Sequence, residues 1–338
     1  MRHLIAAVIA LTLPLAATAQ GTGDIARDAV ERHVLPRFEA LDAASTALAG
    51  VAAEHCAPDA PALREAYQSA FDAWISASHL RFGPTEAEDR AFALAFWPDT
   101  RGLTPRSLRT LITEADPVID SAESFADVSI AARGFYALEM VLFDPEIAAL
   151  GDEAYRCALT EVMTEDIAAL SRAILTDWQE GYASALTDPG EGGPYRTEAE
   201  PLQELFKALT YGLEFTSDSR LGRPLGTFDA PQPARAEAWR SGRSLRHVRL
   251  SLASLADLGA ILAQRDPALR ARLAAAFGAA LESAEALDDP VFAGVTDPQA
   301  RLRVESLQAA IERARDIVRD ELGPELGVAP GFNALDGD

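Results

Sequence analysis

The sequence predicts an all-α protein made of two antiparallel helical bundles. Apolar residues recur at three- and four-residue spacing along most of the chain, which is the pattern of helices that bury one face. Segments with the alternating pattern of β-strands are scarce. Groups of Gly, Pro and Asp separate the periodic segments, and helices longer than the loops that join them form antiparallel bundles.

Five periodic segments define the expected helices in chain order. Their apolar faces comprise Val30, Val34, Phe38 and Leu41; Leu63, Tyr67, Phe71 and Trp74; Leu202, Leu205, Phe206 and Leu209; Leu245, Val248, Leu252 and Leu255; and Leu302, Leu307 and Ile311. The breakers that end helices lie at 57–61, 83–84, 188–194, 222–226 and 288–290.

The chain begins with the pattern of a bacterial signal peptide. A basic start is followed by an apolar run from Leu4 to Leu15 and by small residues ending at Ala19. We therefore expect residues 1–19 to be cleaved and the mature protein to be periplasmic. The apolar run is shorter than the ~20 residues that a membrane-spanning helix needs, and no later run qualifies. We expect no transmembrane segment.

The length of the mature chain predicts two domains. About 320 residues exceed what one core comfortably holds. The strongest breaker, at 187–194, contains three Gly and two Pro and lies near the middle. We expect an N-terminal helical bundle over 20–190 and a C-terminal helical bundle over 191–338.

Two cysteines, Cys56 and Cys157, predict one disulfide, because an exported chain meets an oxidising compartment. A reactive or metal-binding thiol pair is the alternative, although the spacing is not that of a C-x-x-C motif. The 52 acidic and 30 basic residues give a net charge of −22, which disfavours nucleic acid as a partner and favours cations. Solubility alone would also explain this charge.

One expected helix, from about Val128 to Phe143, is apolar nearly all round and should be buried. Within it, Arg133, Tyr136 and Glu139 recur every three residues and would form a polar stripe. A buried carboxylate needs a cation, a metal ion or several hydrogen-bond donors. Glu139 is therefore either part of an internal ion pair, for example with Arg133, or part of a ligand site.

A second polar stripe lies in the other half. Lys207, Tyr211, Glu214 and Asp218 follow one another at four-, three- and four-residue steps, just before Arg220. Carboxylates facing Glu139 across an interface would bind a hard cation through oxygen atoms. A solvated acidic face is the alternative.

Basic residues also gather in this half. Arg240, Arg243, Arg246, His247 and Arg249 crowd one expected helix, and guanidinium groups suit carboxylate or phosphate partners. They either neutralise the acidic stripe or bind an anionic ligand such as a chelated iron complex. His79 is a further candidate ligand residue, although a lone histidine in a helix is more often packed than functional.

The stretch from Ala132 to Phe143 resembles the signature of the imelysin family, in which Gly, His and Glu follow the pattern G-x-H-x-x-E before an apolar run. Gly134 and Glu139 match this pattern, whereas Tyr136 stands where the family has histidine. A phenol, with a pKa near ~10, is a ligand chiefly for hard ferric-like ions, so we expect Tyr136 to change or remove the metal chemistry of the family.

Further motifs match the family in the same order along the chain. They are Trp74 with Arg81-Phe-Gly-Pro84, Phe96-Trp-Pro-Asp99, Arg220-Leu-Gly-Arg-Pro-Leu-Gly226 and the terminal Gly331 to Asp338. The resemblance implies two helical domains with the signature helix near their interface. It also implies a link to bacterial iron uptake, with other envelope iron-uptake proteins as partners.

We therefore expect non-enzymatic binding of a metal ion, such as iron, or of a metal-bearing ligand, with Glu139 and Tyr136 as candidate metal ligands and no other cofactor. The family's peptidase label supplies the alternative of a metallopeptidase, although the chain has no H-E-x-x-H, G-x-S-x-G or clustered histidines. A scaffold whose metal site has decayed is the third reading, and Tyr136 is its main support.

Overall fold

The computed structural model describes residues 22–328, and all regular structure in this range is helical apart from an isolated bridge between Thr227 and Ala230. The all-α prediction is confirmed. The predicted signal peptide and the terminal Gly331 to Asp338 motif lie outside the described residues. Within 22–328, no helix combines the length and the apolar character needed to cross a bilayer.

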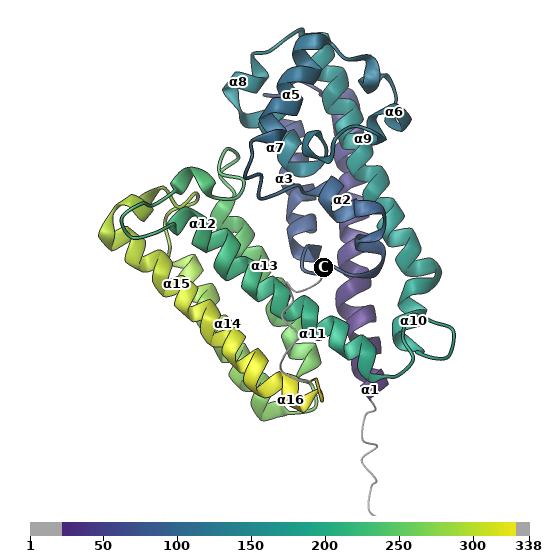
Figure 1. The fold of residues 1–338 in the computed structure, drawn as a ribbon, viewed down its shortest axis with the longest axis vertical. Helices are drawn as coiled ribbons and strands as arrows, with labels where there is room; N and C mark the ends of the chain where they lie inside the picture. The colour runs from purple at the N-terminus through teal and green to yellow at the C-terminus, as the bar shows by residue number, and fades with distance from the viewer. Residues whose placement is uncertain (1–21, 329–338) are drawn as a thin grey trace, which may run out of the picture.

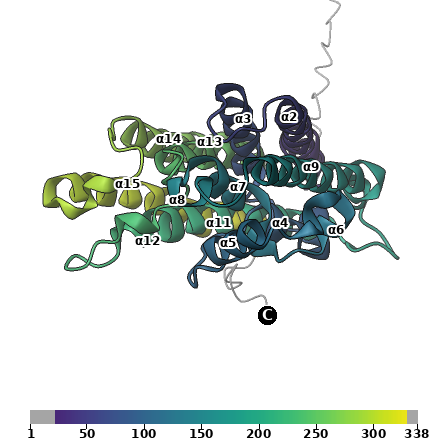
Figure 2. The ribbon, with the colours of Figure 1, turned by 90° about the horizontal axis from the view of Figure 1, so that it is seen from above.

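The first half of the chain is built around three long antiparallel helices. They are α2 (Leu35–Glu54), α3 (Pro61–Ala77) and α9 (Glu153–Asp177), and α2 packs along both of the others (Figures 1 and 2). Shorter helices lie at one end of these three in Figure 1: α5 (Leu103–Glu114), α6 (Ala122–Ala126), α7 (Gly134–Phe143) and α8 (Pro145–Ala148). Helix α4 (Arg90–Leu94) packs against α9 and α7. The first helix, α1 (Thr22–Ala29), continues into α2 through one π-helical turn.

The second half forms a separate stack of helices beside the first (Figure 1). Helices α13 (Ser244–Leu262), α14 (Pro267–Glu285) and α15 (Pro298–Ile317) pack in sequence, and α11 (Ala199–Glu214) lies against α13 and α15. The remaining short helices are α10 (Ala183–Thr187), α12 (Gly222–Leu225) and α16 (Gly323–Glu325). The predicted boundary falls in the loop between α10 and α11.

The two halves touch along several helices. Helix α3 packs against α13, and α1 contacts both α11 and α13. One buried apolar cluster includes residues from both halves, such as Trp74 and Leu252. This extended contact gives a rigid setting for polar groups that meet between the halves.

The periodic segments form helices largely as expected, with three corrections. Leu302 does not belong to the apolar face of α15, because it is 61% exposed, and Val304 is buried in its place. The expected loop at 222–226 is helical up to Leu225, and the chain turns only at Gly226, where φ is +54°.

The third correction concerns the signature helix, which begins at Gly134 rather than near Val128. Gly134 has φ of +73°, a left-handed conformation that cannot continue a right-handed helix from upstream. Arg133 before it is extended. The rest of α7 is buried from Gly134 to Leu142, as its uniformly apolar sequence predicts.

Candidate functional site

Glu139 lies at the interface of the two halves and is only 3% exposed. Its Oε1 atom accepts hydrogen bonds from the backbone N–H of Ser241, at 2.9 Å, and from the Ser241 hydroxyl, at 2.7 Å. No ion pair or hydrogen bond to Oε2 is found among residues 22–328, so the expected internal ion pair with Arg133 is wrong. Burial raises the pKa of Glu139, and the two Ser241 donors only partly offset this effect.

Tyr136, one turn before Glu139, joins a second buried carboxylate. Its hydroxyl donates to Oε1 of Glu237, whose Oε2 accepts from Nε of Arg220 at 2.7 Å. Burial is the largest effect on the pKa of Glu237 and would raise it, but the charge of Arg220 and the interactions with His247 and Tyr136 together outweigh burial and lower the pKa to about 2. Burial, followed by the charge of Glu237, raises the pKa of Tyr136 well above 10, so the phenol keeps its proton.

The same polar network continues through His247 and Arg243. His247 Nδ1 lies 3.0 Å from Glu237 Oε2, and its Nε2 accepts from Arg243 Nε at 2.9 Å. Arg243 in turn reaches Asp72 of α3. Burial lowers the pKa of His247 to about 4, so its ring is neutral at neutral pH.

A cavity of about 340 Å³ opens between the two halves, and we call it the interface cavity. Tyr136, Glu139 and Met140 of α7 form one part of its wall, beside Trp97 and Asp99. The opposite part comes from the second half and comprises Arg223, Ala234, Arg235, Ala236, Ala238, Trp239 and Arg240. The signature residues Tyr136 and Glu139 therefore face a space that a ligand of moderate size could fill.

Arg220 belongs to this site through Glu237, but the interface cavity does not include it as a lining residue. Arg133 does not reach the site. Its guanidinium forms a two-pronged ion pair with Asp166 of α9, at 2.9 and 2.6 Å. The three-residue spacing places Tyr136 and Glu139 on one face of α7 but does not place Arg133 there, because Arg133 precedes the helix and its backbone is extended.

Glu214 and Asp218 do not face Glu139. Both carboxylates lie beside Arg315 of α15, at 3.5 and 3.6 Å, and neither lines the interface cavity. The chain from Phe215 to Leu221 is π-helical, which changes the rotation between these positions. The expected pairing of the two stripes across the interface is therefore not found.

His79 forms part of a different cluster. Its Nε2 lies 2.8 Å from Nε2 of His33, and His33 Nδ1 lies 3.2 Å from a carboxylate oxygen of Asp257. His79 also lines a second cavity, of about 640 Å³, together with Lys207 and Tyr211. Burial lowers the pKa of both histidines, that of His33 to about 4.

The basic cluster of the second half neutralises acids of both halves, although not the Glu214 and Asp218 stripe. Arg240 pairs with Asp144 at 2.6 Å, Arg243 and Arg246 share Asp72, and Arg249 lies 3.6 Å from Glu285. Most of these pairs join the second half to the first, so they position the segment that carries Glu237 and Ser241.

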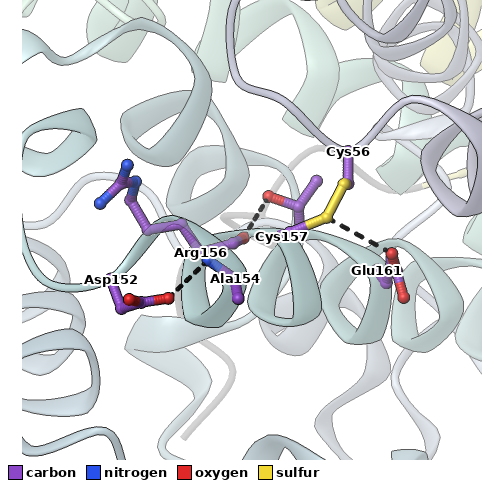
Figure 3. The surroundings of a disulfide bond; sticks show 7 residues. Cys56, Asp152, Ala154, Arg156, Cys157 and Glu161 are labelled. Carbon is purple, nitrogen blue, oxygen red and sulfur yellow. Dashed lines mark hydrogen bonds between the residues drawn. A yellow bond between two sulfur atoms is a disulfide. The ribbon is translucent and has the colours of Figure 1, made fainter.

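The cysteines form the predicted disulfide, which ties the end of α2 to α9 across a sequence separation of 101 (Figure 3). Within residues 22–328, the two sulfurs and a carboxylate oxygen of Glu161 are the single set of three His, Cys, Asp or Glu ligand atoms that all lie within 4.8 Å of one another. Because a disulfide offers no thiolate, this group is not a metal site.

The residues that complete the site around α7 were not identified from the sequence. Glu237 and Ser241 lie in the irregular segment between α12 and α13, where no periodicity marks a buried position. The only available signal was the neighbouring arginine cluster, because acids that pair with buried arginines are often buried as well.

The fold and the site together define a helical protein of two packed halves with a polar cavity between them. The family model of imelysin, which carries a peptidase M75 label, matches residues 34–318, so the chain belongs to the imelysin family. No curated protein matches the sequence.

Two solved structures share this fold. An imelysin-like protein from Psychrobacter arcticum 273-4 is 20% identical with a TM-score of 0.78, and the match covers 92% of this chain and 97% of that one. A putative iron-regulated protein A precursor from Parabacteroides distasonis ATCC 8503 is 14% identical with a TM-score of 0.73, covering 92% and 98%.

Proposed function

We propose that this imelysin-family protein is a periplasmic binding protein that holds a metal-bearing ligand in its interface cavity and serves iron uptake. The observation that carries the proposal is Glu139 Oε2, which has no hydrogen-bond partner among residues 22–328 and belongs to a side chain that is only 3% exposed and lines the interface cavity. A buried carboxylate held in this way is costly unless a cation or donor meets it.

The donor set suits a chelated metal better than a bare ion. Glu237 uses both oxygens within the protein, and the protonated phenol of Tyr136 donates to it. Glu139 is then the one carboxylate of this network with an oxygen that is not hydrogen-bonded within residues 22–328. A hard cation takes about six oxygen ligands, so this single oxygen cannot hold a bare ion. A ligand that brings its own donors to the metal would need only this oxygen from the protein.

Three features motivate the location and the link to iron. The first 19 residues have the pattern of a signal peptide, and the disulfide suits an oxidising compartment. The solved structure from Parabacteroides distasonis is described as a putative iron-regulated protein A precursor. The signal-peptide pattern and the disulfide support a location in the cell envelope, and the solved structure motivates the link to iron.

The donor set also favours binding over peptide hydrolysis. A catalytic zinc is typically held by three protein ligands, and residues 22–328 bring no such set to Glu139. Incubation with unfolded protein substrates, with and without a chelator, separates the two functions. We expect that the protein does not cleave these substrates. Cleavage that stops when a chelator is added would instead support the metallopeptidase.

Isothermal titration calorimetry tests the proposed ligand. The probes are ferric citrate and, separately, ferric, ferrous, copper and zinc ions. We expect saturable binding of ferric citrate by the wild type and binding at least ~10-fold weaker by Glu139→Gln, which removes the charge but keeps the shape.

Glu39→Gln is the matched control, because Glu39 is an exposed residue of α2 outside the cavity. It should bind like the wild type. Absence of saturable binding of every probe by the wild type, or equal binding by Glu139→Gln, would overturn the proposal.

A further inference from the structure

The interface cavity contains two arginines that no carboxylate neutralises. Arg223 of α12 and Arg235 of the turn before Glu237 both line the cavity, and neither forms an ion pair within residues 22–328. Arg240, in the same wall, pairs with Asp144. Arg223 is half-buried and Arg235 is exposed, and the cavity wall as a whole holds three arginines and two acidic residues.

Arg223 also has an unused hydrogen-bond donor. Its Nε atom is buried without a hydrogen-bond partner, although a buried donor left unpaired is costly. The guanidinium lies over the ring of Trp97, 5.6 Å from its centroid, and this contact fixes the cation in the cavity wall. The side chain is therefore positioned before a ligand arrives.

The two arginines are close enough to repel each other. Burial, and then the positive charge of Arg235, lowers the pKa of Arg223. An anion between them would relieve this repulsion and satisfy the free donor. A guanidinium group fits a carboxylate through two parallel hydrogen bonds.

The acidic group of the cavity wall other than Glu139 is Asp99, which is already engaged. Asp99 accepts backbone N–H bonds from Thr104, at 2.8 Å, and from Arg101, at 3.2 Å, and so holds the start of α5. This arrangement leaves the arginines to an anion from outside the protein.

We propose that Arg223 and Arg235 form an anion subsite of the interface cavity, which binds the carboxylate groups of a metal chelate whose metal faces Glu139. The inference rests on the proposed function and names the ligand class, a polycarboxylate chelate. The cavity would then offer positive groups to the chelator and a negative oxygen to the metal.

Calorimetric titrations with citrate, ferric citrate and inorganic phosphate test the subsite. We expect Arg223→Gln and Arg235→Gln each to lower the affinity for citrate and for ferric citrate by about 10-fold or more, because each variant loses charge-assisted hydrogen bonds to the ligand. Arg270→Gln is the control, because Arg270 is an exposed residue of α14 that does not line the cavity. It should bind like the wild type, and thermal melting should show all variants folded.

The outcomes separate the subsite from the proposed function. If binding of ferric citrate depends on Glu139 but not on Arg223 or Arg235, the anion subsite is overturned and the proposed function stands. If citrate binding depends on the arginines, while ferric citrate binds no more tightly and Glu139→Gln has no effect, the anion subsite stands. The proposed binding of a metal at Glu139 is then overturned. Phosphate that binds more tightly than citrate overturns the assignment to carboxylates.

Discussion

At the scale of single residues, two buried glutamates of the same site have opposite environments. Glu237 meets Arg220 and the phenol of Tyr136 through both of its oxygens, and its pKa falls to about 2 although burial opposes this. Glu139 meets only the uncharged donors of Ser241, and burial raises its pKa. Glu237 is thus a structural anion, whereas Glu139 has one oxygen without a hydrogen-bond partner among residues 22–328.

The buried histidines predict how stability depends on pH. Burial lowers the pKa of His33 and of His247 from 6.5 to about 4, so the unfolded chain takes up protons first as the pH falls. The free energy of unfolding should therefore decrease between pH 6.5 and pH 4, by on the order of 3 kcal/mol for each histidine. Urea denaturation at pH 7, 6, 5 and 4 measures this decrease.

Other groups also titrate in this range. The raised pKa values of Glu139 and Asp166 make the folded state more stable as the pH falls, which opposes the effect of the histidines. Variants therefore test whether the histidines cause the decrease. His33→Gln should make the decrease smaller. His55→Gln, a change of an exposed histidine, should leave it unchanged. The same decrease in all three proteins would show that buried histidine is not its cause.

At the scale of elements, the start of α7 depends on Gly134. A Cβ atom there would lie 2.2 Å from the carbonyl oxygen of Leu94 and 2.3 Å from that of Ala93, and φ is +73°. We expect Gly134→Ala to lower the free energy of unfolding by about 3 kcal/mol or more, because backbone overlap adds to left-handed strain. Chemical denaturation measures the change.

Gly50→Ala provides the matched control near the C-terminal end of α2. A Cβ atom at Gly50 meets nothing within 4 Å, and alanine favours helix, so this variant should gain up to ~1 kcal/mol. If Gly134→Ala were as stable as the wild type, the left-handed glycine would not be what fixes the start of α7.

Helices were predicted from the sequence more completely than the site. The apolar spacing of Leu63, Tyr67, Phe71 and Trp74 is local, and all four are buried as it predicts. The partners of Tyr136 and Glu139 lie 101 and 102 residues away, in a segment without periodicity. Only the packing of one half on the other brings them together, so Glu237 could not be predicted.

At the scale of the whole molecule, the interface cavity is the place where polar side chains of the two halves face the same space. The first half supplies Glu139 and Trp97, and the second supplies Arg223 and Arg235. Ion pairs such as Arg240 with Asp144 hold the walls together. A ligand that contacts both walls would bind only the folded, assembled molecule, and would stabilise it accordingly.

The most direct test of this site is a crystal structure of the protein grown with ferric citrate, with diffraction recorded at the iron absorption edge. We predict an anomalous iron peak in the interface cavity, next to Oε2 of Glu139 and absent from crystals of Glu139→Gln. An iron peak elsewhere in the molecule, or an equal peak in the variant, would contradict a ligand site at Glu139.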